Sequence, residues 1–404
     1  MPDTYAYRVR DRQGKLLEGT IEAESTTLVA NKLRQMGYVP IAIDRKDESA
    51  FKKELKLFGQ KVKLKDLAIF SRQFATMINS GLSLLRSLYI LADQTENKML
   101  ARVLVEVRQD VEKGASLSQA LNKHPKVFSR LYVSMVRAGE IGGVLDSVLM
   151  RLSATLEKQV ELRNKVRSAM TYPVAVLSLC LLIVTAMLLF IVPIFEGLYT
   201  DLGGTLPLPT RILLVISKLM KLIVPFSIVG AVVGTFLFRR WIRTDKGRYA
   251  WDSAKLRPPI FGKLVQKTAI ARFSRTLAAL LRSGVPILES LEIVAETVSN
   301  AVMARAIKDV QMAVKGGDSI ARPLHQHKIF PPMVVQMIAV GEETGAVDDM
   351  LDKIADFYEA EVEATVNALT SLLEPVLIVF LGGAVGGMVV SLYMPMFNII
   401  KLIK

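Results

Sequence analysis

The fold is decided by Phe70-Ser-Arg-Gln-Phe-Ala-Thr-Met-Ile-Asn-Ser-Gly-Leu82, because Phe273-Ser-Arg-Thr-Leu-Ala-Ala-Leu-Leu-Arg-Ser-Gly-Val285 repeats it 203 residues later. A second block follows in both places: Ala138-Gly-Glu-Ile-Gly-Gly-Val-Leu-Asp146 corresponds to Val340-Gly-Glu-Glu-Thr-Gly-Ala-Val-Asp348 at an offset of 202. Matches that keep their order and spacing over this length indicate an internal duplication. The change of offset indicates that the second copy lost one residue between the two blocks.

Three apolar stretches follow or separate the copies. They are Val174–Phe195, Leu222–Phe238 and Pro375–Ile400, of 22, 17 and 26 residues. At about 1.5 Å per residue, the first and third can cross a hydrocarbon core of about 30 Å. The second needs flanking lysines that snorkel, or a locally thinner bilayer. We expect membrane helices at 173–195, 212–238 and 375–400, the alternative being buried helices of a large soluble core.

The composition agrees with a membrane protein that carries charged cytoplasmic parts. Of 404 residues, 51% are hydrophobic and 22% charged, with a mean hydropathy of +0.34 and a formal net charge of +14. The length favours two or three domains. One cysteine excludes an intrachain disulfide and a cysteine-based zinc site, and three histidines leave little room for a histidine-based metal centre.

Basic residues predict the orientation of the chain. Residues 1–172 hold 29 Lys and Arg against 19 acids, residues 239–267 hold nine against two, and residues 196–211 hold one against two. Lysine and arginine accumulate on the cytoplasmic side of a membrane. The first 20 residues carry seven charges and no apolar segment, so we expect a cytoplasmic N-terminus. Three spans then put both copies in the cytoplasm and the C-terminus in the periplasm.

The spacing of apolar residues predicts that both copies are helical. Leu67, Phe70, Phe74 and Met77 recur on one face of a helix, and each copy has room for about six helices. Gly81 and Gly284 stand where a left-handed residue closes a helix. Another apolar stripe runs from Leu145 to Val160, and no helix breaker follows it before Pro173, so we expect the last helix of the copy to run into the span. The turn positions shared by the copies are Ser80, Gly81, Gly139, Glu140, Ser283, Gly284, Gly341 and Glu342.

Alternating apolar residues near the N-terminus predict a small ββαβ module before the copies. The fold class is therefore an all-α integral membrane protein: two repeated cytoplasmic six-helix bundles and three transmembrane helices, with a small N-terminal α+β module. The expected segments are the module at 1–45, a charged linker at 46–65, the first bundle at 66–172, a span at 173–195, a periplasmic loop at 196–211, a span at 212–238, a basic juxtamembrane segment at 239–267, the second bundle at 268–374 and a span at 375–400.

Signatures of catalysis are missing from the sequence. Gly14-Lys15 and Gly262-Lys263 are not followed by Ser or Thr, so neither is a P-loop, and there is no HExxH or GxSxG. For His325 and His327, a polar loop is favoured over a metal site. None of the apolar stretches has an ionisable residue in its interior, which argues against a transport path within one chain. We expect no catalytic residue, cofactor or metal, and no enzymatic activity.

Two features go beyond packing. Gly382, Gly383, Gly386 and Gly387 form overlapping small-xxx-small steps, which allow close helix packing in membranes. Residues 66–172 have a net charge of +5 and residues 268–374 one of −6. These opposite net charges leave two interpretations: the two copies attract each other, within one chain or between chains, or their charged helix faces are simply exposed to solvent. Binding of a divalent cation by the acidic cluster of the second copy is a further alternative. The cluster consists of Asp348, Asp349, Asp352, Asp356, Glu359, Glu361 and Glu363.

With two F-S-R-x₇-S-G units, each followed by a Gly-Glu turn and a span that begins near a proline, the sequence resembles the type II secretion F-domain family. The members of this family are inner-membrane platform proteins of type IV pili and type II secretion systems. The resemblance covers residues 5–400 and includes the N-terminal module. Two blocks are more similar to the pilus branch, namely Lys123-His-Pro-Lys-Val-Phe128 and Glu374-Pro-Val-Leu-Ile-Val-Phe-Leu-Gly-Gly383.

The resemblance implies a scaffold of the bacterial inner membrane. Such a protein couples a hexameric assembly ATPase, and possibly a retraction ATPase, to the transmembrane helices of pilins or pseudopilins. It works with other inner-membrane components and forms homo-oligomers, dimers being favoured; no nucleic acid is involved. The alternatives are the same role in type II secretion and, from another class, a small channel or membrane enzyme. Rotation and piston-like coupling both stay open.

Overall fold

The computed structural model describes residues 3–10, 16–23, 26–45, 61–201 and 208–399. The chain divides into two compact units, Met1–Lys63 with Ile90–Val105, and Leu64–Tyr89 with Glu106–Lys404. Most of the expected linker at 46–65 lies outside the described residues.

A small sheet forms near the N-terminus. Its elements are β1 (Asp3–Arg10), β2 (Leu16–Ala23), α1 (Thr26–Gln35) and β3 (Val39–Arg45). The strands are antiparallel in the order β2-β1-β3. Tyr5 and Val9 lie an even number of residues apart and so face the same side of β1. On that side they are buried with Val29 and Leu33 of α1.

The two copies contain the same series of helices. In the first copy they are α3 (Leu64–Asn79), α4 (Leu84–Gln94), α5 (Lys98–Glu112), α6 (Leu117–Asn122), α7 (Arg130–Gly142) and α8 (Leu145–Ala186). In the second they are α12 (Phe261–Arg282), α13 (Ile287–Thr297), α14 (Ala301–Lys315), α15 (Ala321–Leu324), α16 (Pro332–Thr344) and α17 (Val347–Ile399). Within the described residues each copy therefore has six helices, and α3 packs on α8 as α12 packs on α17.

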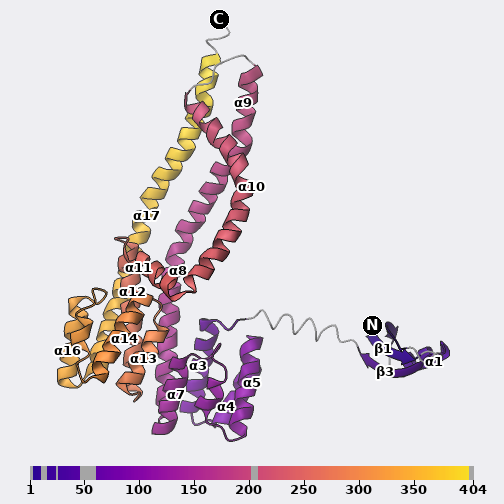
Figure 1. Cartoon of the computed structure of the whole chain (residues 1–404), viewed down its shortest axis with the longest axis vertical. Coiled ribbons are helices and arrows are strands. Elements are labelled where there is room, and N and C mark those ends of the chain that lie inside the picture. Colours follow the sequence, from indigo (N-terminus) through magenta and orange to yellow (C-terminus); the bar gives the residue numbers. More distant parts are fainter. Residues whose placement is uncertain (1–2, 11–15, 24–25, 46–60, 202–207, 400–404) are drawn as a thin grey trace. The chain divides into compact units, whose positions relative to one another are not determined.

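Each copy ends in a helix that leaves it without a break. α8 continues through the π-helical turn η1 (Met187–Ile191) into α9 (Val192–Asp201), and α17 is one helix of 53 residues (Figure 1). The prediction that the last helix runs into the apolar stretch is confirmed. In the described part of the chain, two helices are long and apolar enough to cross a membrane, at Leu145–Gly197 and Val347–Met394.

Two connecting segments are more helical than expected. Between the copies lie α10 (Leu208–Ile242) and α11 (Asp245–Leu256). The expected loop at 196–211 is therefore largely helical, because α9 reaches Asp201 and α10 starts at Leu208. Gly203, Gly204 and Pro207 fall between those two residues, whereas Gly197 lies within α9 and Pro209 is the second residue of α10. Proline is tolerated in the first turn of a helix, because the N–H that it lacks has no partner there. The basic segment at 239–267 likewise contains α11 and the start of α12.

Candidate functional site

Each copy closes its first helix with the same Ser-Gly turn. The hydroxyls of Ser80 and Ser283 donate to the carbonyl four residues earlier, at 2.8 and 2.7 Å. The glycines that follow, Gly81 and Gly284, have φ angles of +84° and +81°. Glycine adopts this left-handed conformation without steric cost because it has no Cβ. These four turn positions therefore have one geometry in both copies.

Gly139 and Gly341 let two helices meet closely. A Cβ added to Gly139 would lie 3.0 Å from the Cβ of Val148, and one added to Gly341 would lie 2.9 Å from the Cα of Val347. Both distances are shorter than ordinary packing contacts. The glycines thus allow α7 and α16 to approach the first turns of α8 and α17.

The adjoining glutamates cap a short helix. The Glu140 carboxylate accepts hydrogen bonds from the first two N–H groups of α6, at 2.5 and 3.1 Å. Glu342 accepts from two N–H groups at the start of α15, at 2.5 and 3.0 Å. Backbone N–H groups at a helix start have no partner in the helix, and a carboxylate there also complements the helix dipole. The Gly-Glu pair therefore joins three helices in each copy.

One arginine–glutamate pair holds the first helix of each copy to the last. Arg72 Nε lies 2.7 Å from Glu157 Oε1, and Arg275 Nε lies 3.0 Å from Glu359 Oε1. A second guanidinium nitrogen of each arginine bonds the other carboxylate oxygen. Bidentate pairs of this kind fix both distance and orientation. They therefore fasten the N-terminal portion of each long helix to its own copy.

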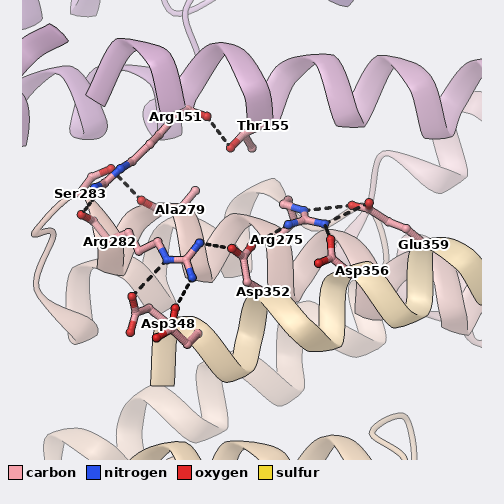
Figure 2. Close-up of polar contacts among 11 residues, drawn as sticks. Arg151, Thr155, Arg275, Ala279, Arg282, Ser283, Asp348, Asp352, Asp356 and Glu359 are labelled. Carbon is pink, nitrogen blue, oxygen red and sulfur yellow. Dashed lines mark hydrogen bonds and ion pairs between the residues drawn. The ribbon is translucent and has the colours of Figure 1, made fainter. Parts of the chain in front are cut away.

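The second copy builds a larger network on this pair (Figure 2). Arg275 also contacts Asp352 and Asp356, at 2.6 and 2.5 Å. Its side chain is 14% exposed. Burial alone would lower the pKa of Arg275, but the hydrogen bonds and charges of Glu359, Asp356 and Asp352 outweigh it and raise the pKa. The guanidinium thus stays charged and joins three carboxylates of α17.

Arg282 extends the network to the first turn of α17. It pairs with Asp348 at 3.2 Å, and also with Asp349 and Asp352 (Figure 2). The corresponding residue of the first copy is Asn79, which has no charge. The start of α17 is therefore attached to its copy by more ion pairs than the start of α8.

The remaining acids of this run also have basic partners. Lys267 Nζ lies 2.7 Å from Glu361, and Lys165 Nζ lies 2.8 Å from Glu363. Among the residues that the structure describes, no group of three or more histidine, cysteine, aspartate or glutamate side chains is arranged to hold a metal ion. The carboxylates that were considered as ligands of a divalent cation are thus paired with arginine and lysine side chains.

The two copies also contact each other through charge. Arg130 of α7 reaches Glu292 and Glu296 of α13, at 2.9 and 2.8 Å. On α8, Arg151 donates to the backbone carbonyl of Arg282 (Figure 2). Together with the Lys165 pair, these contacts join the basic first copy to the acidic second copy. Of the alternatives left open by the sequence, pairing within one chain is the one observed.

One histidine of each copy, His124 in the first and His327 in the second, lies in a corresponding place. His124 Nε2 lies 3.7 Å from Glu106, and His327 Nε2 lies 3.5 Å from Asp309. Each acid belongs to the third helix of its copy, so the arrangement repeats. It supports the interpretation of these histidines as polar loop residues.

The apolar part of α10 shares a small core with the apolar parts of the two long helices, the first of which continues from α8 through η1 into α9. Its buried members are Leu188, Val192, Leu214, Met388 and Leu392. They come from η1, α9, α10 and α17, so α10 packs against the outer parts of both long helices.

A serine of α10 lies in this region. The Ser217 hydroxyl donates to the carbonyl of Leu188 at 2.6 Å, and its side chain is buried. Leu188 lies five residues before Pro193, the spacing of a π-helical hydrogen bond. Proline has no N–H, so the bond that would close this turn is missing. Ser217 supplies the absent donor.

A threonine of α10 does the same in the second copy. The Thr210 hydroxyl donates to the carbonyl of Ser391 at 2.6 Å. Ser391 lies four residues before Pro395, which cannot make the α-helical bond to it. A carbonyl without a donor is costly in an apolar surrounding, where water is absent. The matching prolines of the two copies thus each leave a carbonyl that α10 satisfies.

The predicted glycine face lies apart from these contacts. A Cβ added to Gly382, Gly383, Gly386 or Gly387 would have no neighbour within 4 Å among the described residues. Within one chain, the structure does not bring another helix against these four positions. Close helix packing there stays a prediction, and it would require another molecule.

Sequence reasoning missed the two hydroxyls of α10. The prolines inside the apolar stretches were the available signal, because each implies a carbonyl that needs a donor from elsewhere. The identity of the donor depends on how α10 packs, which the sequence pattern does not reveal. Arg72, Arg275 and Arg282 were also not singled out, although the first two belong to the repeated Phe-Ser-Arg block.

Fold and contacts together define a class of protein. It is a duplicated helical protein, in which each copy is fastened by an arginine–glutamate pair to a helix that is long and apolar enough to cross a membrane.

Family comparison agrees with this class. The model of "type II secretion system (T2SS), protein F" matches residues 70–193 and again residues 273–395. The model of the N-terminal domain of the same protein matches residues 1–44. The chain belongs to the type II secretion system protein F family.

Relatives carry two kinds of name. Type IV pilus assembly protein PilC of Thermus thermophilus is 48% identical over 98% of both chains. PilC of Myxococcus xanthus is 41% identical over 99% of this chain and 96% of its own. Type II secretion system protein F of Aeromonas hydrophila is 33% identical over 95% of this chain and 99% of its own.

Proposed function

We propose that this chain is the inner-membrane platform protein of type IV pilus biogenesis. In this role it couples a cytoplasmic assembly ATPase to the extraction and polymerisation of pilin subunits. The observation that carries the proposal is the 48% identity to a pilus assembly protein over 98% of both chains. Family membership and the duplicated fold agree with it.

The continuity of the long helices supports a coupling role. α8 and α17 begin in contact with the other helices of their copies and extend into the apolar segments. Ion pairs fasten their N-terminal portions to α3 and α12. A displacement of either copy is thereby passed to an apolar helix without a flexible joint. The proposed function needs no catalytic group in this chain.

For the topology, we propose three spans, at 173–195, 212–238 and 375–400. Both copies and the N-terminus are cytoplasmic and the C-terminus is periplasmic. The packing of α10 against both long helices supports the second span. Cysteine labelling tests this orientation: a cysteine added after Lys404 should react with an impermeant maleimide from outside. Labelling of that cysteine only after the cells are opened would contradict the three-span topology.

For the partners, we propose that the two copies and the basic segment at 239–267 contact the ATPase, while the spans contact pilin helices. The open face at Gly382, Gly383, Gly386 and Gly387 suits such a helix or a second copy of this chain, a dimer being favoured. Cysteine cross-linking at Gly386, with pilin and with itself, distinguishes the two occupants. Absence of both cross-links would contradict the assignment of this face.

A second candidate is the same platform role in type II secretion, acting on pseudopilins. The 33% identity to protein F of Aeromonas hydrophila over nearly the whole chain favours it as the alternative.

Deletion of the gene separates the two candidates. Electron microscopy of the deletion strain should show loss of surface filaments while the pilin level stays normal, and re-expression should restore the filaments. Normal filaments together with exoproteins trapped in the periplasm would instead support the type II secretion role. A purified protein that hydrolysed ATP without a partner would contradict both.

A further inference from the structure

A basic cavity lies where the first copy meets the second. It has a volume of about 480 Å³ and is lined by α8, α11 and α12 and the residues before α14. Four cationic side chains line it: Arg163, Arg167, Lys255 and Arg272. Asp252 is the one acidic residue among the lining residues. The cavity is therefore strongly cationic.

Asp252 is already engaged. One of its carboxylate oxygens accepts from Lys255 Nζ at 2.8 Å, and the other accepts from the backbone N–H of Ala301 at 2.9 Å. Within the part of the chain that the structure describes, Arg163, Arg167 and Arg272 have no ion pair. Three guanidinium groups thus face one cavity without a carboxylate to balance them.

Arg272 is the most constrained of the three. Its Nη1 donates to the Ser299 hydroxyl at 2.9 Å, but its Nε is buried without a hydrogen-bond partner among the described residues. Burial and the nearby charge of Arg163 lower the pKa of Arg272. A buried donor without an acceptor is destabilising. An anion in the cavity would supply the missing acceptor and relieve the repulsion.

The repeat shows that the fold does not require this charge. The position of the first copy that corresponds to Arg272 is Ile69, an exposed residue of α3. The arginine therefore belongs to this cavity and not to the duplicated bundle. A role in ligand binding accounts for it better than a role in packing.

Apolar side chains line the same cavity. They are Leu162, Val166 and Met170 of α8 and Leu264 and Val265 of α12. Arg167 is the last charged residue of α8 before the apolar stretch that starts at Val174. Seven residues of helix span about 10 Å, which places the cavity beside the expected membrane surface. The lining thus combines guanidinium groups with apolar side chains at the depth where lipid headgroups end.

We propose that this cavity binds the phosphate group of an anionic phospholipid of the cytoplasmic leaflet. Guanidinium groups match phosphate oxygens in bidentate geometry, and basic pockets beside membrane helices suit anionic headgroups. The apolar side chains of the lining receive the glycerol end and the start of an acyl chain. The proposal rests on the membrane orientation given under the proposed function, but not on the pilus role.

Lipid binding by the purified full-length protein tests the proposal. The protein is placed in detergent with phosphatidylglycerol or phosphatidylcholine, and bound lipid is counted by native mass spectrometry. Wild type should retain phosphatidylglycerol in preference to phosphatidylcholine. The substitution Arg272→Gln should weaken phosphatidylglycerol binding about tenfold or more, since a hydrogen bond to a charged group is lost. Arg167→Gln should act in the same direction with less risk to folding, because Arg167 is exposed.

Arg239→Gln is the matched control. It removes an exposed charge from the end of α10 without touching the cavity, and it should leave lipid binding unchanged. Equal phosphatidylglycerol binding by wild type, Arg272→Gln and Arg167→Gln would overturn the proposal. So would equal loss in the control, which would indicate non-specific attraction. If inorganic phosphate bound in the cavity while the lipid did not, the lipid assignment would be wrong. Failure of the protein to enter lipid vesicles would instead contradict its membrane location.

Discussion

Ser217 on α10 donates its hydroxyl to the backbone carbonyl of Leu188, five residues before Pro193 and at a distance of 2.6 Å. Thr210, on the same helix, donates to Ser391, four residues before Pro395. The two prolines correspond in the duplicated sequence, whereas α10 has no repeat partner. A single unrepeated helix thus supplies, in both repeated helices, the hydrogen-bond donor that the proline lacks.

Removal of these hydroxyls should loosen the apolar helices. For Ser217→Ala we expect a loss of about 0.6 to 1.7 kcal/mol in the free energy of unfolding, the range of hydrogen bonds between membrane helices. Thr210→Val should cost a similar amount. Unfolding in mixed micelles, followed by circular dichroism, measures both. Ser371→Ala is the control, because Ser371 is exposed and bonds the Asn367 carbonyl of its own helix. Equal effects of Ser217→Ala and the control would show that the contact contributes nothing.

Arg275 should matter more to stability than Arg72. Arg275→Met leaves Asp352, Asp356 and Glu359 without their shared cation, and breaking a largely buried ion pair costs roughly 3 to 5 kcal/mol. Arg72→Met removes one more exposed pair and should cost about 1 kcal/mol or less. Thermal unfolding of the two variants against wild type gives the comparison. A larger loss for Arg72→Met would contradict the difference between the copies.

Acid should weaken the first copy through Glu157. The hydrogen bond from Arg72 lowers the pKa of Glu157 below its ordinary value of 4.5, against a smaller opposing effect of burial. Because the folded-state pKa is the lower one, the pair stabilises fully above about pH 4.5 and loses its effect as the pH falls through the folded-state value.

The stability difference between wild type and Glu157→Gln should therefore shrink as the pH falls below about 4.5. Melting temperatures measured from pH 7 to pH 3 test this. Glu343→Gln serves as the control, because Glu343 is exposed and has no ion pair in the described part of the chain. A difference that stayed constant over this range would exclude the Glu157 pair as its source.

Gly341 and Gly382 should respond in opposite ways to alanine. At Gly341 the new Cβ would lie 2.9 Å from the Cα of Val347, so Gly341→Ala should destabilise the protein by about 1 to 3 kcal/mol. At Gly382 the Cβ meets no atom of the described residues within 4 Å, and alanine favours a helix by up to about 1 kcal/mol over glycine. Thermal unfolding in detergent measures both changes. A destabilised Gly382→Ala monomer would show that the face is occupied within one chain.

The sequence predicted the repeated architecture well because the duplication provides two independent sets of local signals for each helix. The Ser-Gly and Gly-Glu turns, the six helices of each copy and the continuous last helix all follow from local signals. The link at 196–211 was predicted less well, since its charges predict the side of the membrane but not the ends of helices.

The site was less predictable because it depends on pairs that are distant in the sequence. The opposite charges of the copies indicated attraction, but not that Arg130 meets Glu292 or that Arg275 gathers three acids. Those partners depend on how the helices pack and turn, which periodicity leaves undetermined. The cavity around Arg272 needed three helices to be placed before it could be recognised.

The length of α17 has a geometrical consequence. Its 53 residues extend about 80 Å at 1.5 Å per residue. A tilt of about 5° at the Val347 end would shift the Ile399 end sideways by about 7 Å, more than the pitch of one helical turn. A small rearrangement among the carboxylates around Arg275 and Arg282 would thus move the far end of α17 sideways by about the length of a side chain.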